Sequence, residues 1–235
     1  MKRHLCIMNP KEVRMYIVVN SGKIPSDLIR IIGQTVARKI VALEQMGPMG
    51  SPQAEVETEE SSLYREWKHN LYPKIVTEVN HKLFSLLTDP TIFIDPSGSV
   101  AVFSPLRYEN RPPILKRAKL LRDTQLHLNL GLRPERGRYV MHLDFNQDVQ
   151  MSVGKLSAQV AHSVGKMIEY MVQGDLWTLG EWIRGGYALM LNGLPSSDLH
   201  LMTNVPKCVW TEDAGRTEIP SGTLTTVAHF PQNFS

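Results

Sequence analysis

Cysteine is scarce in this 235-residue sequence, which contains only Cys6 and Cys208. Two cysteines cannot build a disulfide framework, and neither has a second cysteine or a histidine at the spacing of a zinc motif. A reducing, cytoplasmic compartment is therefore expected. Long apolar runs are also missing. No stretch of 18 apolar residues suggests a membrane-spanning helix, and the first residues lack the apolar segment of a secretory signal.

Neither sign of charge dominates the sequence. It has 26 Lys and Arg against 23 Asp and Glu, a formal net charge of +3. A surface for nucleic acid would therefore have to be a local patch. The composition is 42% hydrophobic and 21% charged, as in an ordinary soluble globular protein, and the length allows one large domain or two small ones.

The chain is organised around residues 151–171, where the pattern predicts a helix. Apolar residues recur there at i, i+3, i+4 and i+7 and share one face. Lys155 lies in the first turn and opposes the helix dipole, so helix stability explains it poorly. A helix N-terminus with an added cation does suit a phosphate group. A polar stripe of this kind is by itself more often a solvated surface. The polar side chains opposite the apolar face are Lys155, Gln159, His162 and Lys166.

A second stretch, residues 212–230, combines two turns and a strand. Asp213 begins the first turn, Asp-Ala-Gly, and Thr217 follows it, while Pro-Ser-Gly at 220–222 makes the second turn. Residues 223–230 are rich in β-branched side chains and predict a strand. The Asp-Ala-Gly turn alone is a weak signal, because turns of this kind are common.

Together the two stretches resemble the type-2 peptidyl-tRNA hydrolase family. That family typically shows a D-L-x-M loop, then G-K-x-A-A-Q-x-x-H-A and, near its end, D-A-G-x-T-x-I-x-x-G-T-x-T. The counterparts here are Asp148 to Met151, Gly154 to His162, and Asp213 to Thr225. The resemblance covers roughly residues 138–235. It implies an enzyme that hydrolyses the ester between a peptide and tRNA, with tRNA as its partner and no metal or cofactor.

The resemblance implies roles for five residues. Asp213 would orient or deprotonate water, or hold a partner that does. Lys155 would contact a phosphate or the carbonyl oxygen, and His162 would transfer a proton or form a hydrogen bond. Two threonines would present hydroxyl donors, and Thr223 is an open alternative because strand alternation leaves positions 223 and 225 on one face. The candidate catalytic set is Lys155, His162, Asp213, Thr217 and Thr225.

The first half of the sequence repeats the order of elements in the second half. In both halves a tryptophan precedes a tyrosine by five residues, and a Pro-Ser-Gly turn follows. We interpret this as a tandem duplication, although any two α/β halves share some turns and element boundaries of this kind. Arg30 takes the place of Lys155, and Ala37 that of His162, so the first copy is expected to have lost the chemistry. The expected elements are strands at 15–19, 74–79, 91–94 and 99–103 with helices at 26–46 and 63–67, then strands at 139–145, 187–191, 207–211 and 223–230 with helices at 155–172 and 176–183.

The expected fold class is therefore α/β, with two similar small units, each a mixed sheet flanked by helices in three layers. The expected domains are a degenerate hydrolase-like domain at 1–105, a basic linker at 106–137 and a peptidyl-tRNA hydrolase-like domain at 138–235. Two linked copies should pack as a pseudo-dimer within one chain, which predicts a monomer in solution.

The segment between the two halves is basic. Residues 106–138 carry nine basic and three acidic side chains, a local balance of +6, and residues 115–122 predict a short basic helix. Basic linkers often serve solubility alone, but beside a tRNA site we expect contacts with phosphates. The expected nucleic-acid contacts are Lys116, Arg117, Lys119, Arg122, Lys166 and Arg216.

Two functions remain open from the sequence. Lys155, His162 and Asp213 are all present, which favours a peptidyl-tRNA hydrolase that works through its second unit. Val153 stands where the family often has a basic residue, which favours a non-catalytic RNA-binding or scaffolding protein built on the same fold. Release of an N-acylated amino acid from charged tRNA would distinguish the two.

Overall fold

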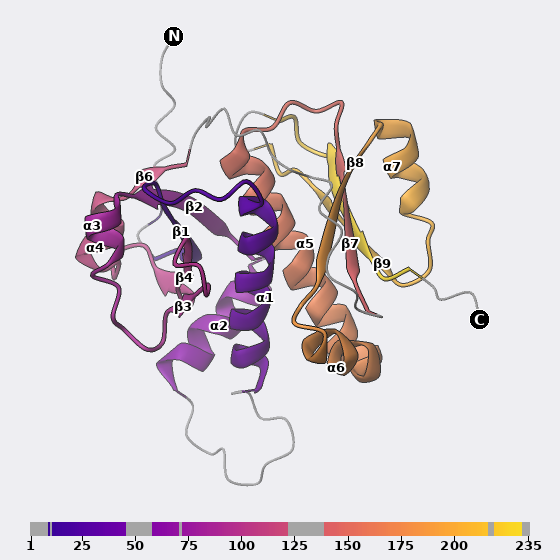
Figure 1. The fold of residues 1–235 in the computed structure, drawn as a ribbon. Helices are drawn as coiled ribbons and strands as arrows, with labels where there is room; N and C mark the ends of the chain where they lie inside the picture. Colours follow the sequence, from indigo (N-terminus) through magenta and orange to yellow (C-terminus); the bar gives the residue numbers. More distant parts are fainter. Residues whose placement is uncertain are drawn as a thin grey trace, which may run out of the picture.

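Two β-sheets with helices between them and outside them make up the protein (Figure 1). The computed structural model describes residue 9 and residues 11–45, 58–70, 72–121, 139–215 and 219–231. The α/β class and the two mixed sheets expected from the sequence are confirmed within these residues.

The first sheet has the strand order β3-β4-β1-β2-β6, and β5 also pairs with β1. β1 and β2 run parallel, and the other pairs are antiparallel. All but one residue of β1 are buried, because helices cover both faces of the sheet, and its centre, Met15 to Val19, is therefore a continuous apolar run. The strands are β1 (Val13–Asn20), β2 (Lys74–Val79), β3 (Phe93–Ile94), β4 (Val100–Val102), β5 (Leu106–Arg107) and β6 (Lys119–Leu120).

The second sheet has the order β8-β7-β10-β9. β7 and β8 run parallel, while β10 is antiparallel to both of its neighbours, β7 and β9. The pairing of β10 with β9 contains an irregularity between Leu224 and Thr226. The strands are β7 (Met141–Asn146), β8 (Leu189–Leu194), β9 (Cys208–Glu212) and β10 (Leu224–His229).

The two longest helices, α1 (Leu28–Gln45) and α5 (Val153–Gly174), pack against each other between the sheets (Figure 1). Each also contacts the sheet of the other half, α1 through β8 and α5 through β2. A Cβ atom on Gly33 of α1 would lie 2.5 Å from Cδ1 of Leu189 and 3.2 Å from Cγ1 of Val160, so a larger residue there would force these side chains to move. One hydrophobic core consequently spans both halves.

Shorter helices complete the layers. α2 (Glu59–His69) follows α1, and α6 (Leu176–Arg184) follows α5. On the outer face of the first sheet lie α3 (His81–Phe84) and α4 (Pro113–Arg117), whose Phe84 and Leu115 are buried in a second apolar cluster. On the outer face of the second sheet, α7 (Ser196–Met202) buries Leu199 against β10.

The two sheets have the same topology. The order β3-β4-β1-β2 corresponds to β9-β10-β7-β8, with a parallel pair and two antiparallel pairs at matching places. The two Trp–Tyr pairs also match. Tyr72 and Tyr187 have φ of 57° and 62°, and each tryptophan indole donates to the carbonyl of the residue after the tyrosine, at 2.7 and 2.9 Å. These features support an internal repeat.

Part of the segment expected to link the halves is folded onto the first sheet. β5 pairs with β1, and β6 pairs with Thr77 and Glu78 of β2. The basic helix expected at 115–122 is wrong in its second half, because α4 ends at Arg117 and the chain becomes strand at Lys119. Residues 122–138 lie outside the described part of the chain. No helix among the described residues is long and apolar enough to cross a membrane.

Candidate active site at the start of α5

The first turn of α5 is fixed by a cap and by a contact with the first half of the chain. Oγ of Ser152 accepts a hydrogen bond from the amide of Lys155 at 3.2 Å, as N-cap residues do. A Cβ atom on Gly154 would lie only 2.1 Å from the carbonyl oxygen of Leu121, so glycine is required there. The glycine therefore allows the N-terminus of α5 to lie close to the end of β6.

Asp213 lies just after β9 and connects two turns. Its amide donates to the carbonyl of Thr223 at 2.9 Å, and its own carbonyl accepts from the amide of Gly222 at 2.8 Å. Its Oδ1 accepts from the amide of Gly215 at 2.8 Å. Gly215 has φ of +71°, and a Cβ atom there would lie 2.8 Å from Cβ of Ser221, so the Asp-Ala-Gly turn depends on its glycine.

The carboxylate of Asp213 faces α5. Its Oδ2 accepts a hydrogen bond from Nε2 of Gln159 at 2.7 Å and forms an ion pair with Nζ of Lys155. Asp213 is only 4% exposed, and the Lys155 side chain is 14% exposed. Lys155 and Gln159 are four residues apart on one helix face, which is why both reach the same carboxylate. This arrangement can place a carboxylate beside a water molecule and an ammonium group beside a developing negative charge.

Gln159 was missing from the catalytic set expected from the sequence. Gln159 lies in the polar stripe, four residues after Lys155. This spacing was the signal that both side chains point to the same partner. Nothing in the local pattern favours the Gln159 amide over the His162 imidazole further along the same stripe. In the structure Gln159 is buried and bonded to Asp213.

His162 is not brought to Asp213. It lies seven residues beyond Lys155, roughly 10 Å further along the helix axis, and its ring lies 5.9 Å from the ring of Tyr72. Burial, with smaller effects of Lys74 and Lys166, lowers the pKa of His162 to about 2. The imidazole is therefore neutral near pH 7, and a role that needs it to take up a proton at that pH has no support.

The threonines differ from expectation. Thr225 is fully buried, and its hydroxyl donates to the carbonyl of Thr211 at 2.9 Å, so it does not present a donor to a ligand. The expectation for Thr225 came from the resemblance, and the irregularity in β10 breaks the simple alternation that had kept Thr223 as an alternative. The hydroxyl of Thr223 donates to the carbonyl of Pro220 at 2.8 Å and holds the second turn. Thr217 and Arg216 lie outside the described residues.

Comparison with known proteins adds to this geometry. A family model described as Peptidyl-tRNA hydrolase PTH2 matches residues 139–235, which begin just before β7. A protein of Staphylothermus marinus named "Peptidyl-tRNA hydrolase" is 34% identical over 90 residues, covering 36% of this chain and 74% of that protein. The chain belongs to the peptidyl-tRNA hydrolase 2 family.

The mouse protein "Peptidyl-tRNA hydrolase 2, mitochondrial" is also similar, at 28% identity over 116 residues. That match covers 47% of this chain and 64% of the mouse protein, so the chain spans just under two thirds of this relative. The first sheet, which ends at Leu120, lies wholly outside the residues that the family model matches. Among the described residues of this family member, no cluster of His, Cys, Asp and Glu is arranged to hold a metal ion.

The basic residues expected to contact nucleic acid are spread over several surfaces of this family member. Lys116, Arg117 and Lys119 are exposed on α4 and β6, and β6 leads directly to Leu121 beside the start of α5. Lys166 lies further along α5 and donates to the carbonyl of Trp210 at 2.8 Å. Arg122 lies outside the described residues.

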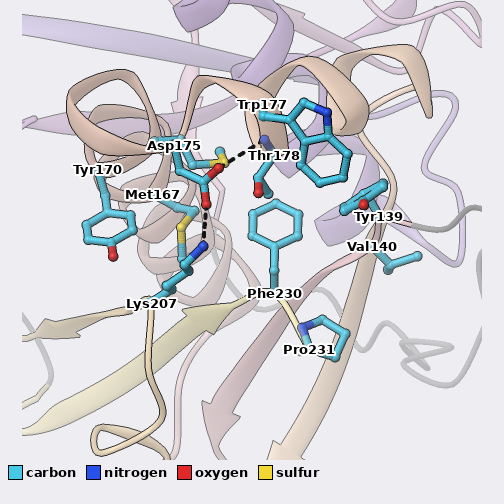
Figure 2. A pocket seen from close by; sticks show the side chains of 11 residues that line it. Tyr139, Val140, Met167, Tyr170, Asp175, Trp177, Thr178, Lys207, Phe230 and Pro231 are labelled. Atoms are coloured by element: carbon cyan, nitrogen blue, oxygen red, sulfur yellow. Dashed lines mark hydrogen bonds and ion pairs between the residues drawn. The ribbon is translucent and has the colours of Figure 1, made fainter. Parts of the chain in front are cut away.

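A pocket of about 360 Å³ lies near the other end of α5. Figure 2 shows its aromatic wall and the ion pair between Lys207 and Asp175, whose atoms are 2.7 Å apart. One lining residue, Met167, is twelve residues beyond Lys155, roughly 18 Å along the helix. The pocket is thus separate from the Asp213 carboxylate. Its lining includes Tyr139, Met167, Tyr170, Trp177, Lys207 and Phe230.

Proposed function

We propose that the C-terminal half hydrolyses the ester that joins a peptide, or an N-acylated amino acid, to tRNA. The observation that carries the proposal is the buried Asp213 carboxylate held by Gln159 and Lys155 at the start of α5. The family membership of this half and the names of both relatives support it. The substrate is the ester of a tRNA, and the cytoplasmic location expected from the sequence remains a prediction.

The proposed reaction begins with a water molecule hydrogen-bonded to Asp213. Asp213 accepts a proton as the water oxygen forms a bond to the ester carbonyl carbon, and the ammonium of Lys155 stabilises the resulting oxyanion. The tetrahedral intermediate then breaks its bond to the ribose oxygen, which leaves as a hydroxyl after receiving the proton from Asp213. Neutral His162 takes no part in this step.

The test is release of an N-acetylated amino acid from N-acetyl-aminoacyl-tRNA by the purified protein. The proposal predicts release well above the rate without protein. Tight binding of tRNA without release would instead favour the alternative, a non-catalytic RNA-binding or scaffolding protein. The observation favouring that alternative is the depressed pKa of His162, which removes one expected proton-transfer group.

We also propose that the two halves arose by tandem duplication. Asp95 takes the place of Asp213: its amide donates to the carbonyl of Val100 at 2.9 Å, and its carbonyl accepts from the amide of Gly98 at 2.9 Å. The same pair of bonds frames Asp213. The matching sheets and Trp–Tyr pairs support the same proposal.

The first copy is proposed to be a fold without the active site. The Asp95 carboxylate accepts hydrogen bonds from the amides of its own turn, including Ser99 at 2.7 Å, instead of facing a helix. Arg30, at the place of Lys155, bonds Gln34 at 3.1 Å and pairs with Asp27. The segment through Leu121 belongs with this copy, because β5, α4 and β6 pack on its sheet.

A further inference from the structure

Beyond Gln159, the polar face of α5 meets residues from the first half of the chain. α5 contacts β2 as well as β9. Tyr72, just before β2, lies against His162, and Lys74 opens β2. Lys74 donates to the carbonyl of Tyr72 at 2.9 Å and lies over two aromatic rings, 5.3 Å from that of Trp67 and 5.4 Å from that of Tyr72. We call Lys74, His162 and Lys166 the cross-unit cluster.

The positive charges of Lys74 and Lys166 disfavour protonation of His162, and the charge of Lys166 disfavours that of Lys74. Burial, and then the charge of Lys166, holds the pKa of Lys74 well below its usual value. Burial lowers the pKa of Lys166 too, although Glu212 on β9 acts in the opposite direction. Glu169, one turn further along α5, accepts a hydrogen bond from the hydroxyl of Tyr72, and its carboxylate lies 3.9 Å from Nζ of Lys68. Within the described part of the chain, no carboxylate forms an ion pair with Lys74 or Lys166.

The cluster also holds a polar atom whose hydrogen-bonding capacity is unused. Nε2 of His162 is buried and has no hydrogen-bond partner among the described residues. A buried polar atom of this kind costs free energy unless it finds a partner. Two lysines that repel each other beside such an atom form an arrangement that an anion would stabilise.

We propose that the cross-unit cluster binds a phosphate group of the tRNA substrate. This inference rests on the proposed function, because it supposes that tRNA lies along α5. Lys74 comes from the first half and Lys166 from the second, so the copy without an active site would supply part of the substrate-binding surface. The two lysines of α5, Lys155 and Lys166, are eleven residues apart, roughly 16 Å along the helix. A phosphate bound by the cross-unit cluster would position the tRNA along α5 so that its ester lies at Lys155.

The test measures the salt dependence of binding to uncharged tRNA, which requires no hydrolysis. The variants are Lys74→Gln, Lys166→Gln and the double variant, with Lys82→Gln on exposed α3 as a control of equal charge change. Each cluster variant should reduce the slope of log affinity against log salt by about 0.7 to 0.9, the value for one phosphate contact. Because the proposed phosphate is held only when both lysines contact it, each single variant already loses the whole contact, and the double variant should lose no more slope than a single variant.

Equal slopes in the wild type and both single variants would overturn the proposal, as would an additive loss in the double variant or a wild type that binds no tRNA. Lys74→Arg keeps the charge and should keep the slope, which separates loss of a phosphate contact from loss of packing over the rings. Thermal unfolding checks that each variant is folded.

A second substrate separates this inference from the proposed function. An N-acetyl-aminoacyl ester of adenosine has no phosphate, so the cluster variants should hydrolyse it at the wild-type rate. A wild type that hydrolyses neither ester refutes the proposed function but leaves the salt slopes to decide on the cluster. Normal hydrolysis with unchanged salt slopes refutes the cluster alone.

Discussion

At the scale of single residues, Lys155 and His162 show how far two side chains on one helix face can differ. Lys155 reaches the Asp213 carboxylate and keeps 14% of its side chain exposed. His162 lies against Tyr72 of the first half, and its pKa falls to about 2. The packing of the first half against α5 therefore decides which members of the polar stripe can take part in chemistry.

The neutral state of His162 predicts a pH dependence of stability. Its pKa is about 2 in the folded protein against a usual 6.5, so below pH 6.5 the unfolded chain binds a proton that the folded protein does not. Stability must then fall as the pH falls, by about 2 kcal/mol between pH 7 and pH 5 for this group alone. Urea unfolding at both pH values should show a smaller decline for His162→Gln. Parallel declines would contradict the burial of a neutral imidazole.

The sequence anticipated some of these residues and not others, for physical reasons. Lys155 and Asp213 were expected together, and the structure brings them together. The position of His162 depends on contacts with Tyr72, about ninety residues earlier, and nothing in the local pattern of α5 contains that contact. Thr225 was expected from the resemblance, but its hydroxyl is bonded within the sheet beside a strand irregularity that β-branched residues alone do not reveal.

At the scale of elements, periodicity predicted α5 and β2 well, because both carry strong patterns of buried residues. The helix expected at 115–122 failed after Arg117. The next residues, Lys119 and Leu120, pair with the edge of β2, and local helix propensity gives no information about a free strand edge elsewhere in the sheet.

The close contact between α5 and the end of β6 gives a second prediction. Gly154→Ala would push a methyl group into the carbonyl of Leu121, so we expect a loss of about 1–3 kcal/mol in stability and a reduced rate of ester hydrolysis. Gly174→Ala, at the other end of the helix, is the control, because nothing lies within 4 Å of its Cβ position. Thermal unfolding and the hydrolysis assay measure both effects. Equal stability of the two variants would contradict the contact.

At the scale of the whole molecule, the central helices pack between two sheets of the same topology and share one core. The sequence predicted two similar α/β units, because the order of elements repeats. It did not predict that α1 would contact β8 and α5 would contact β2, since such contacts depend on how the units dock. The two halves are therefore packed against each other and are not independent domains joined by a flexible linker.

The shared core predicts that the protein is a monomer in solution. Each central helix already packs against its counterpart within the same chain, so these apolar helix faces are covered and are not available to a second chain. Sedimentation velocity at micromolar concentrations should give the mass of one chain, 26.6 kDa. A stable dimer across that range would contradict the pseudo-dimer proposal.

The central claim is that the buried carboxylate at the start of α5 carries the chemistry, and Asp213→Asn tests it most directly. Asn has the same shape and can still bond Gln159, so the fold should survive, but it cannot accept a proton from water. The measurement is the single-turnover rate of N-acetyl-aminoacyl-tRNA hydrolysis at saturating protein, with Asp198→Asn on α7 as a control of equal charge change. We expect a loss of at least about a hundredfold for Asp213→Asn and none for the control. A folded Asp213→Asn variant that hydrolyses the ester at the wild-type rate would contradict the account.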